Sequence, residues 1–325
     1  MDYNKPFKEN QAFFSLFFTF SKRVNLLWRK GKGYTISCFE KRYVLLYSVF
    51  RTDLAVEAYD RLGGETSALS GVTVRRETLF DLPLCAVEIR DEEAAERLGK
   101  GVGHYYTLEL PASLTRSAPH FSAPAAAVAA LIRRCGVPKE GGVLVAALGN
   151  PDITPDALGP LCASSVLVTR HLKAGHDPIW DGFSSVSLLR AGVLGTVGVE
   201  SAVQIRAFCE AVRPSLVLVV DALAGAEAAG LCRSIQICDS GISPGSGVRN
   251  DRARIDRALL GVPVTAIGVP TVTDACTRDG GLGDLFVTPR DLDSAVRACA
   301  RFIAYGINLA LHPGITVEDI DALIG

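Results

Sequence analysis

The chain has 325 residues, of which 48% are hydrophobic and 21% charged, and this composition excludes a wholly disordered protein. The net charge of -1 is unevenly distributed, because residues 1–51 hold ten Lys or Arg against three acids, a balance of +7, and the remainder carries -8. An acidic main body argues against a broad nucleic-acid-binding face. The apolar run at 12–20 is shorter than the roughly 20 residues of a membrane-spanning helix. We therefore expect neither nucleic acid nor a membrane as a direct partner.

The elements predicted first along the chain are short. Runs rich in β-branched residues predict strands over 71–78, 84–90 and 104–110, with a helix over 91–98. Together they suggest a small β-rich subregion that precedes the main sheet.

The later elements alternate between buried strands and helices. Continuous apolar runs predict parallel strands at 143–148, 216–220, 235–238 and 264–269. Start and stop residues predict helices over 124–134, 201–213 and 289–312, and then a short helix that begins with a capping box of Thr316 and Asp319. This order predicts an α/β fold, a mostly parallel sheet flanked by helices with a small extra β subregion. We expect residues 54–325 to form a single domain and residues 1–53 to be an N-terminal extension.

Nine cysteines are scattered singly, mostly within apolar segments, and the sequence contains no CxxC pair or metal-type Cys/His spacing. The apolar run at 12–20 also lacks the small-residue cleavage site of a signal peptide. In a chain of this size, these features predict buried, reduced thiols and a cytoplasmic compartment. They give no reason to expect a metal or a cofactor.

Two aspartates follow two of the predicted parallel strands. Asp221 comes directly after the strand at 216–220, and Asp156 lies in the loop that leaves the strand at 143–148. Reacting groups of an open α/β sheet gather at the carboxyl ends of its strands, so both carboxylates face one cleft if the strands are neighbours. A close carboxyl pair retains one proton near neutral pH, and can activate water with one member and protonate a leaving group with the other. The pattern predicts hydrolysis without a metal, and the alternative is a helix cap and a structural strand-end acid.

A glycine-rich stretch, DSGISPGSG at 239–247, follows the predicted strand at 235–238. Asp239, Ser240 and Gly241 are therefore candidates for the wall of a substrate cleft, together with Asn150 in the loop before Asp156. The stretch lacks the lysine of a GxxxxGK[ST] loop, so nucleotide binding has little support. A substrate-backbone cradle, an anion nest and a simple surface turn all remain open for it.

Other catalytic systems have less support in the sequence. There is no GxSxG motif, and His171 has no obvious Ser or Cys partner at a strand end. A metal held by the two aspartates and His171 is chemically reasonable, since carboxylate and imidazole suit several divalent ions. No residue spacing supports such a site.

The stretch TDLAVEA at 52–58 has two interpretations. It fits a helix start, with Thr52 as the N-cap and Asp53 in the first turn. It also fits a protease cleavage sequence, because an acidic residue precedes Leu54 and a small Ala follows it.

Six motifs occur in order along the chain: RTDLAVEA at 51–58, TPDALGP at 154–160, TRHL at 169–172, DALA at 221–224, DSGISPGSGV at 239–248 and IGVPTV at 267–272. Together they resemble the germination protease family of spore-forming bacteria, peptidase family A25. The resemblance extends from residue 47 to about residue 312.

The resemblance implies an endopeptidase that degrades small acid-soluble spore proteins early in germination, in the cytoplasm of the forespore or the spore core. It implies the fold of the hydrogenase maturation proteases, a homotetramer, and a catalytic aspartate pair that maps onto Asp156 and Asp221. It also implies a zymogen that removes its own N-terminal segment by cleavage after an acidic residue and before an aliphatic one. In this chain the cleavage site falls between Asp53 and Leu54.

Two features depart from the family pattern. The segment before the cleavage sequence is basic, rich in Phe and longer than the usual pro-segment, and an upstream start codon would explain the difference for residues 1–46. The connection at 273–287 is much shorter than the insert that members commonly carry. Two other functions stay open: a metal-directed protease of the hydrogenase-maturation type, and a spore-protein-binding homologue without turnover.

Overall fold

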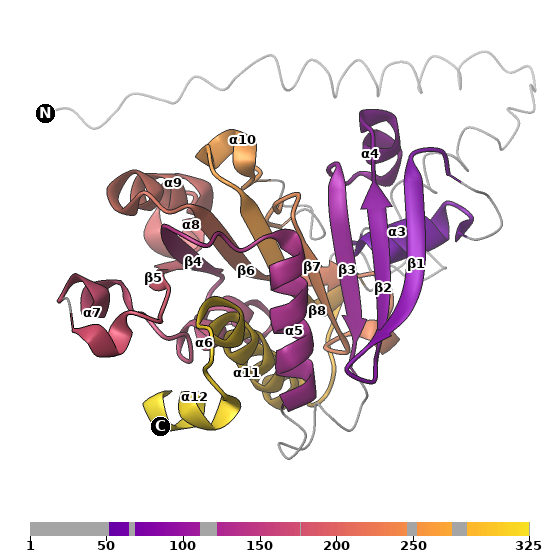
Figure 1. The fold of residues 1–325 in the computed structure, drawn as a ribbon. Coiled ribbons are helices and arrows are strands. Elements are labelled where there is room, and N and C mark those ends of the chain that lie inside the picture. The colour runs from indigo at the N-terminus through magenta and orange to yellow at the C-terminus, as the bar shows by residue number, and fades with distance from the viewer. Residues whose placement is uncertain are drawn as a thin grey trace, which may run out of the picture. The chain divides into compact units, whose positions relative to one another are not determined.

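The computed structural model of the protein describes residues 52–64, 69–110, 122–175, 177–245, 252–274 and 285–324. All of them belong to one compact unit, Val49–Gly325. They form a nine-stranded sheet in the order β1-β2-β3-β7-β8-β6-β4-β5, with β9 paired to β8 and helices on both faces (Figure 1). This mixed architecture confirms the predicted α/β class, but the sheet is not mostly parallel, since three of the strand pairs that the structure describes are parallel and five are antiparallel. The predicted extension at 1–53 lies outside the described residues except for Thr52 and Asp53, as does most of the connection at 273–287.

Both candidate aspartates belong to the parallel half of the sheet, Asp221 within a strand and Asp156 in the connection that follows one. This half consists of β8 (Val264–Asp274), β6 (Leu216–Gly225), β4 (Gly142–Leu148) and β5 (Ser185–Ala191). All three neighbouring pairs are parallel. The apolar runs of β4 and β6 are buried along nearly their whole length because helices cover both faces. Strand β5 was not predicted, because two serines and an arginine interrupt its apolar pattern.

The antiparallel half extends the same sheet. It consists of β1 (Val72–Leu79), β2 (Leu82–Ile89), β3 (Gly103–Glu109) and β7 (Ser234–Cys238). The antiparallel β7–β8 pair joins the two halves. The small β subregion predicted from the sequence is therefore continuous with the main sheet. The two-residue strand β9 (Phe286–Val287) pairs antiparallel with the end of β8.

The prediction that residues 235–238 form a parallel strand is wrong, since Gln236 pairs with Gly268 in an antiparallel register. A short apolar run has the same pattern in either direction. The preceding connection contains only the turn η5 (Ala228–Gly230), which is too short for the helical crossover that a parallel connection needs.

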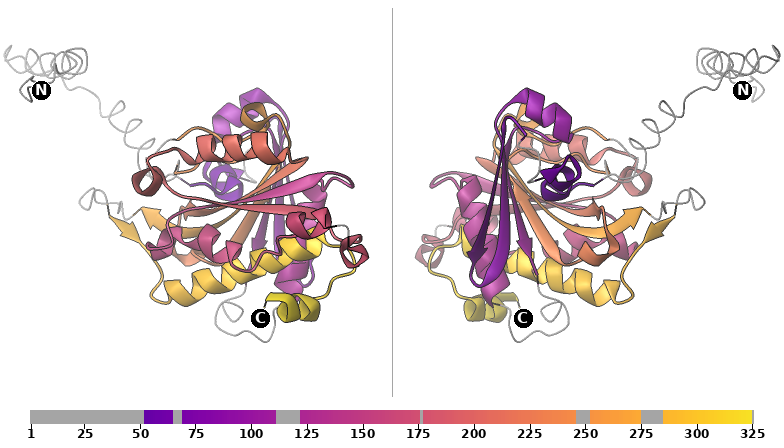
Figure 2. Two further views of the ribbon diagram at one scale, coloured as in Figure 1. Left: turned by 90° about the vertical axis from the view of Figure 1, so that its left-hand side faces the viewer. Right: turned by 90° about the vertical axis from the view of Figure 1, so that its right-hand side faces the viewer.

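Separate sets of helices cover the two faces of the sheet (Figure 2). One face carries α5 (Ser122–Cys135), α6 (Leu158–Ala163), α11 (Leu292–Leu311) and α12 (Val317–Ile324), which share the largest core cluster. The other face carries α9 (Ser201–Val212) and α10 (Arg257–Leu260) over the parallel half. Over the antiparallel half the same face carries α3 (Ala55–Arg61) and α4 (Glu92–Leu98). The shorter elements are α7 (Arg170–Ala174), α8 (Leu194–Val197), η3 (Thr154–Asp156) and η4 (Pro178–Trp180).

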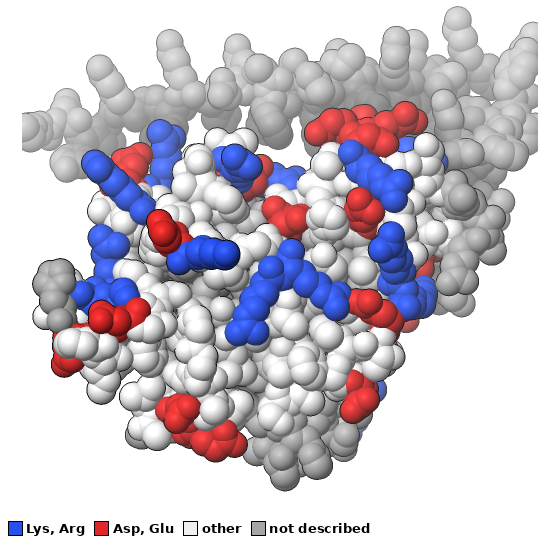
Figure 3. All heavy atoms as spheres, viewed as in Figure 1, with Lys and Arg blue, Asp and Glu red and all other residues white. Residues whose placement is uncertain are grey.

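The described part of the chain contains no helix with the length and apolar character needed to cross a bilayer. On the face drawn in Figure 3, basic and acidic side chains of the described residues are interspersed.

Candidate active site

Asp221 lies inside β6, not directly after it. The strand continues to Gly225, whereas its pairing with β4 ends at Ala147 and Val220. Asp221 is therefore the first residue of β6 beyond the paired part of its neighbour, and its side chain is 6% exposed. The predicted strand at 216–220 was too short, because the residues that follow Asp221 continue to pair with β8.

Asp156 is held by the loop that leaves β4. The backbone N–H of Asn150 donates to Asp156 Oδ2 at 2.8 Å, and the Asp156 N–H donates to the Ile153 carbonyl at 2.8 Å. Gly149 has a φ of +120°, and a Cβ at this position would lie 2.0 Å from the Asp156 carbonyl oxygen. The Thr271 hydroxyl on β8 donates to the Pro155 carbonyl at 2.7 Å, which ties the loop to the sheet. The loop therefore depends on a glycine where it passes closest to Asp156.

The two carboxyl groups line one cavity of about 500 Å³. Burial raises the pKa of Asp221 well above its usual range, and the negative charge of Asp156 raises it further. Burial also raises the pKa of Asp156, but the Asn150 N–H and the charge of Arg252 oppose this rise. Because the pKa of Asp221 is raised more strongly than that of Asp156, the pair favours the state in which Asp221 holds the proton and Asp156 is ionised. Such a pair can supply an acid and a base to one reaction.

The wall of this cavity combines polar groups with apolar side chains. Besides the two aspartates it includes Asp53, Leu148, Gly149, Ile153, Val193, Leu223, Pro244, Gly245, Arg252, Thr271 and Phe286. Arg252 was not singled out in the sequence, and nothing in its neighbours signals a functional role. Its charge acts on both carboxyl groups, because it lowers the pKa of each.

Asp53 lines the same cavity as the aspartate pair and is bound to β6. Its backbone N–H donates to the Ala224 carbonyl at 2.9 Å, and its Oδ2 accepts the Ala224 N–H at 2.8 Å. Helix α3 begins only at Ala55, with Leu54 as the N-cap residue. The interpretation of Thr52 as the helix N-cap is therefore wrong, since its hydroxyl accepts the Leu54 N–H at 3.1 Å before the helix begins.

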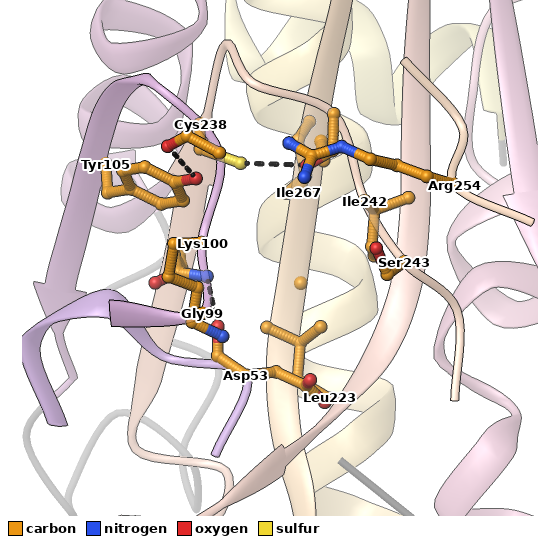
Figure 4. Close-up of a pocket in the computed structure, with 15 residues that line it drawn as sticks. Asp53, Gly99, Lys100, Tyr105, Leu223, Cys238, Ile242, Ser243, Arg254 and Ile267 are labelled. Carbon is orange, nitrogen blue, oxygen red and sulfur yellow. Dashed lines mark hydrogen bonds between the residues drawn. The ribbon is translucent and has the colours of Figure 1, made fainter. Parts of the chain in front are cut away.

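Two side chains from other elements hold the backbone on either side of Leu54. Gln236 on β7 donates from Nε2 to the Asp53 carbonyl at 3.0 Å and accepts the Ala55 N–H on Oε1 at 2.7 Å. Lys100, which follows α4, donates from Nζ to the Thr52 carbonyl at 2.9 Å. Figure 4 shows Asp53, Lys100 and Leu223 around a second, smaller cavity of about 100 Å³. Neither Gln236 nor Lys100 carries a sequence signal for this role.

The glycine-rich loop is divided between two environments. Because β7 runs antiparallel to β8, the loop begins at the end of the strands opposite to the aspartate pair. Asp239 accepts the His104 N–H at 2.7 Å and pairs with His104 Nδ1 at 2.8 Å. Ser240 donates to the Tyr105 hydroxyl at 2.7 Å. The backbone turns at Gly241, with a φ of +82°, and among the loop residues that the structure describes, Pro244 and Gly245 alone reach the larger cavity.

Of the residues singled out in the sequence, the structure therefore brings together Asp156, Asp221, Asn150 and Asp53. Asp239 and Ser240 lie away from the aspartate cavity, and Gly241 lines only the smaller one. His171 is exposed on α7 and does not line the aspartate cavity.

Within the described ranges, no group of three or more His, Cys, Asp or Glu side chains is arranged to hold a metal ion. The seven cysteines described there are all free, and every one except Cys135 is buried.

The sequence as a whole matches known proteins over most of its length. The model of the germination protease family, peptidase family A25, matches residues 49–280. A germination protease from Clostridium perfringens is 35% identical over 86% of this chain and 100% of its own length. One from Caldanaerobacter subterraneus is 36% identical over 84% of this chain and 98% of its own length. One from Bacillus cytotoxicus is 41% identical over 83% of this chain and 76% of its own length.

Among solved structures, the [NiFe] hydrogenase maturation protease HycI from Thermococcus kodakarensis matches with a TM-score of 0.32 and 20% identity, over 52% of this chain and 94% of that one. The family model and the curated relatives confirm the resemblance that the six sequence motifs indicated. The chain belongs to the germination protease family.

Proposed function

We propose that the protein is an endopeptidase that begins the degradation of small acid-soluble spore proteins during germination. We further propose that residues 1–53 are a pro-segment, which the enzyme removes by cutting between Asp53 and Leu54. Membership of the germination protease family supports the general activity. The observation that carries the mechanism is the presence of Asp156, Asp221 and Asp53 in the wall of one cavity.

In the proposed reaction the two aspartates have different roles. Asp156, the ionised member, takes a proton from the attacking water. Asp221, the protonated member, donates a proton to the substrate as the peptide bond breaks. The proposed mechanism requires no metal. By family resemblance, we expect the protein to work as a homotetramer in the cytoplasm of the forespore or the spore core.

The test compares Asp221→Asn and Asp156→Asn with the intact full-length chain. Each substitution removes one partner of the acid–base pair, so we expect both processing and cleavage of an added small acid-soluble spore protein to slow by about 10²- to 10⁴-fold. Mass spectrometry detects the new N-terminus at Leu54, and gel electrophoresis follows the added substrate.

The matched control is Asp152→Asn, which changes an exposed aspartate in the same loop and should leave both rates unchanged. Undiminished cleavage by Asp221→Asn would refute the assignment of the pair. Loss of wild-type activity in a chelator would instead favour a metal-directed protease. An intact wild-type chain that cleaves neither itself nor the added protein would favour a homologue without turnover.

A further inference from the structure

The acidic side chains of the cleavage sequence are both bound by the end of β6. The Ala224 N–H donates to Asp53 Oδ2 at 2.8 Å, and the Ala226 N–H donates to Glu57 Oε2 at 2.8 Å. Gly225, the last residue of β6, separates these two donors, and the two carboxylates are four residues apart in the cleavage sequence. A carboxylate is the stronger acceptor for a backbone N–H because the hydrogen bond is assisted by its charge.

The carboxylate of Asp53 also takes the place of a backbone carbonyl. In an ordinary strand pair the Ala224 N–H would bind a carbonyl, but here it binds the side chain of Asp53. The Asp53 carbonyl, which belongs to the peptide bond predicted to be cut, is therefore left to accept Gln236 Nε2. A residue without a side-chain acceptor at this position would leave the Ala224 N–H without this partner.

Lys100 provides the positive charge next to this segment. It donates to the Thr52 carbonyl at 2.9 Å and lies beside Asp53 in the wall of the smaller cavity (Figure 4). Burial lowers the pKa of Lys100, whereas the charges of Asp53 and Glu57 oppose that fall. A desolvated ammonium group is costly unless a negative charge accompanies it, so Lys100 favours an acidic residue at position 53.

Gln236 sets the register of the bound segment. Its amide contacts the Asp53 carbonyl and the Ala55 N–H, so that the Leu54 residue is held between the two bonds. Gln236 is 6% exposed, and it pairs through Gly268 with Asp221 in one row across β7, β8 and β6. The peptide bond after the acidic residue is therefore held at the level of the sheet where Asp221 lies.

We propose that Lys100, Ala224 and Gln236 form the subsite that selects an acidic residue immediately before the cleaved bond. In the unprocessed chain the occupant is Asp53. Removal of residues 1–53 vacates the subsite, and the acidic residue of a substrate segment then binds there. Glu57 stays on Ala226 and anchors the new N-terminal segment. This inference rests on the proposed function, because it assigns specificity to the same reaction.

The first experiment is a double-mutant cycle on the full-length chain, with the rate of appearance of the Leu54 N-terminus as the readout. The variants are Asp53→Asn, Lys100→Met and the two combined. Asn keeps the acceptor for the Ala224 N–H and removes only the charge. We expect Asp53→Asn to slow processing by about 10- to 100-fold in the wild-type background, in line with the strength of charged hydrogen bonds. In the Lys100→Met background the same change should slow it less than about threefold.

The difference between the effects of Asp53→Asn with and without Lys100 shows whether Lys100 recognises the charge of residue 53 or only supports folding. If the lysine were needed only for folding, its loss would slow processing equally in the chain with Asp53 and in the Asp53→Asn variant. Equal penalties in the two backgrounds would therefore overturn the proposal. Lys139→Met, which removes an exposed lysine, is the matched control. In its background, Asp53→Asn should slow processing as much as it does in the wild-type background.

A second experiment does not depend on activity. Hydrogen exchange over residues 222–226 is measured by mass spectrometry in the Asp221→Asn background, with the same set of variants. Asp53→Asn should accelerate exchange of this segment when Lys100 is present, and should have little effect with Lys100→Met. The subsite is refuted if Asp53→Asn does not change exchange with Lys100 in place. A wild-type chain that never yields the Leu54 terminus, combined with coupled exchange, contradicts the proposed function and leaves the subsite standing as a binding site.

Discussion

At the scale of single residues, Arg252 contributes a positive charge to the aspartate cavity. It lines the same cavity as Asp156 and Asp221, and its positive charge lowers the pKa of both. Asp156 is less deeply buried than Asp221 and receives the Asn150 N–H, so it is the member that ionises first as the pH rises. Arg252 therefore helps to keep the proposed base in its active form.

We expect Arg252→Gln to move the acidic limb of the pH–rate profile to higher pH. The substitution removes a charge that lowers the pKa of Asp156, so Asp156 becomes protonated at a higher pH and activity is lost earlier as the pH falls. The loss on the acidic limb should reach up to about tenfold for each unit by which the limb moves. The measurement is kcat/KM against pH. Arg257→Gln, on the exposed side of α10, is the control. An unmoved acidic limb in Arg252→Gln would contradict this role.

At the scale of elements, α6 packs closely against the strand ends next to the site. A Cβ on Gly159 would lie 2.2 Å from the Leu148 carbonyl oxygen and 2.9 Å from the Val220 carbonyl oxygen. The helix directly follows η3, which contains Asp156. The absence of a side chain at Gly159 thus allows α6 to hold the Asp156 loop against β4 and β6.

We expect Gly159→Ala to displace α6, because the obstructing atoms are backbone and cannot move aside easily. Overpacking of this kind costs about 1–3 kcal/mol in the free energy of unfolding. Urea unfolding measures that cost, and the rate of substrate cleavage should fall with the displaced Asp156. Gly182→Ala has open space around its Cβ and should change neither quantity. Wild-type stability in Gly159→Ala would show that the packing is looser than the structure indicates.

At the scale of the whole molecule, His312 packs the C-terminal end of α11 against the segment that follows η4. It is 1% exposed, and its ring lies 5.0 Å from that of Phe183, which follows η4. Burial lowers the pKa of His312 from 6.5 to about 4, an effect that the Leu167 carbonyl only partly offsets. The folded state therefore favours the neutral ring, and the unfolded chain binds a proton more readily.

This difference predicts an acid-sensitive contribution to stability. The favourable contribution is fully present above pH 6.5, where the unfolded histidine is neutral, and it is lost as the pH falls towards 4. The loss should be roughly 2 kcal/mol in the free energy of unfolding. Urea unfolding at pH 7 and pH 4.5 measures it. His312→Leu should reduce the difference between the two pH values, whereas the exposed His171→Leu should not. An equal pH dependence in His312→Leu and the wild type would refute the assignment.

The amino-acid sequence alone was enough for the fold class and for the family. Strand β4, and β6 as far as Val220, are continuous buried apolar runs, a pattern typical of parallel strands with helices on both faces. The positions of Asp156 and Asp221 after such runs predicted that they meet only if the two strands are neighbours, and the structure shows that β4 and β6 are. Their role as the catalytic pair stays a prediction.

The tertiary structure alone decided the direction of β7, the division of the glycine-rich loop and the partners of Asp53. A run of five apolar and polar residues has the same periodicity in both directions, so the hydrogen bonds with β8 decide its orientation. Lys100, Gln236 and Arg252 come from separate segments and have no shared motif. Their roles arise only from distances across the sheet, which local pattern and spacing do not encode.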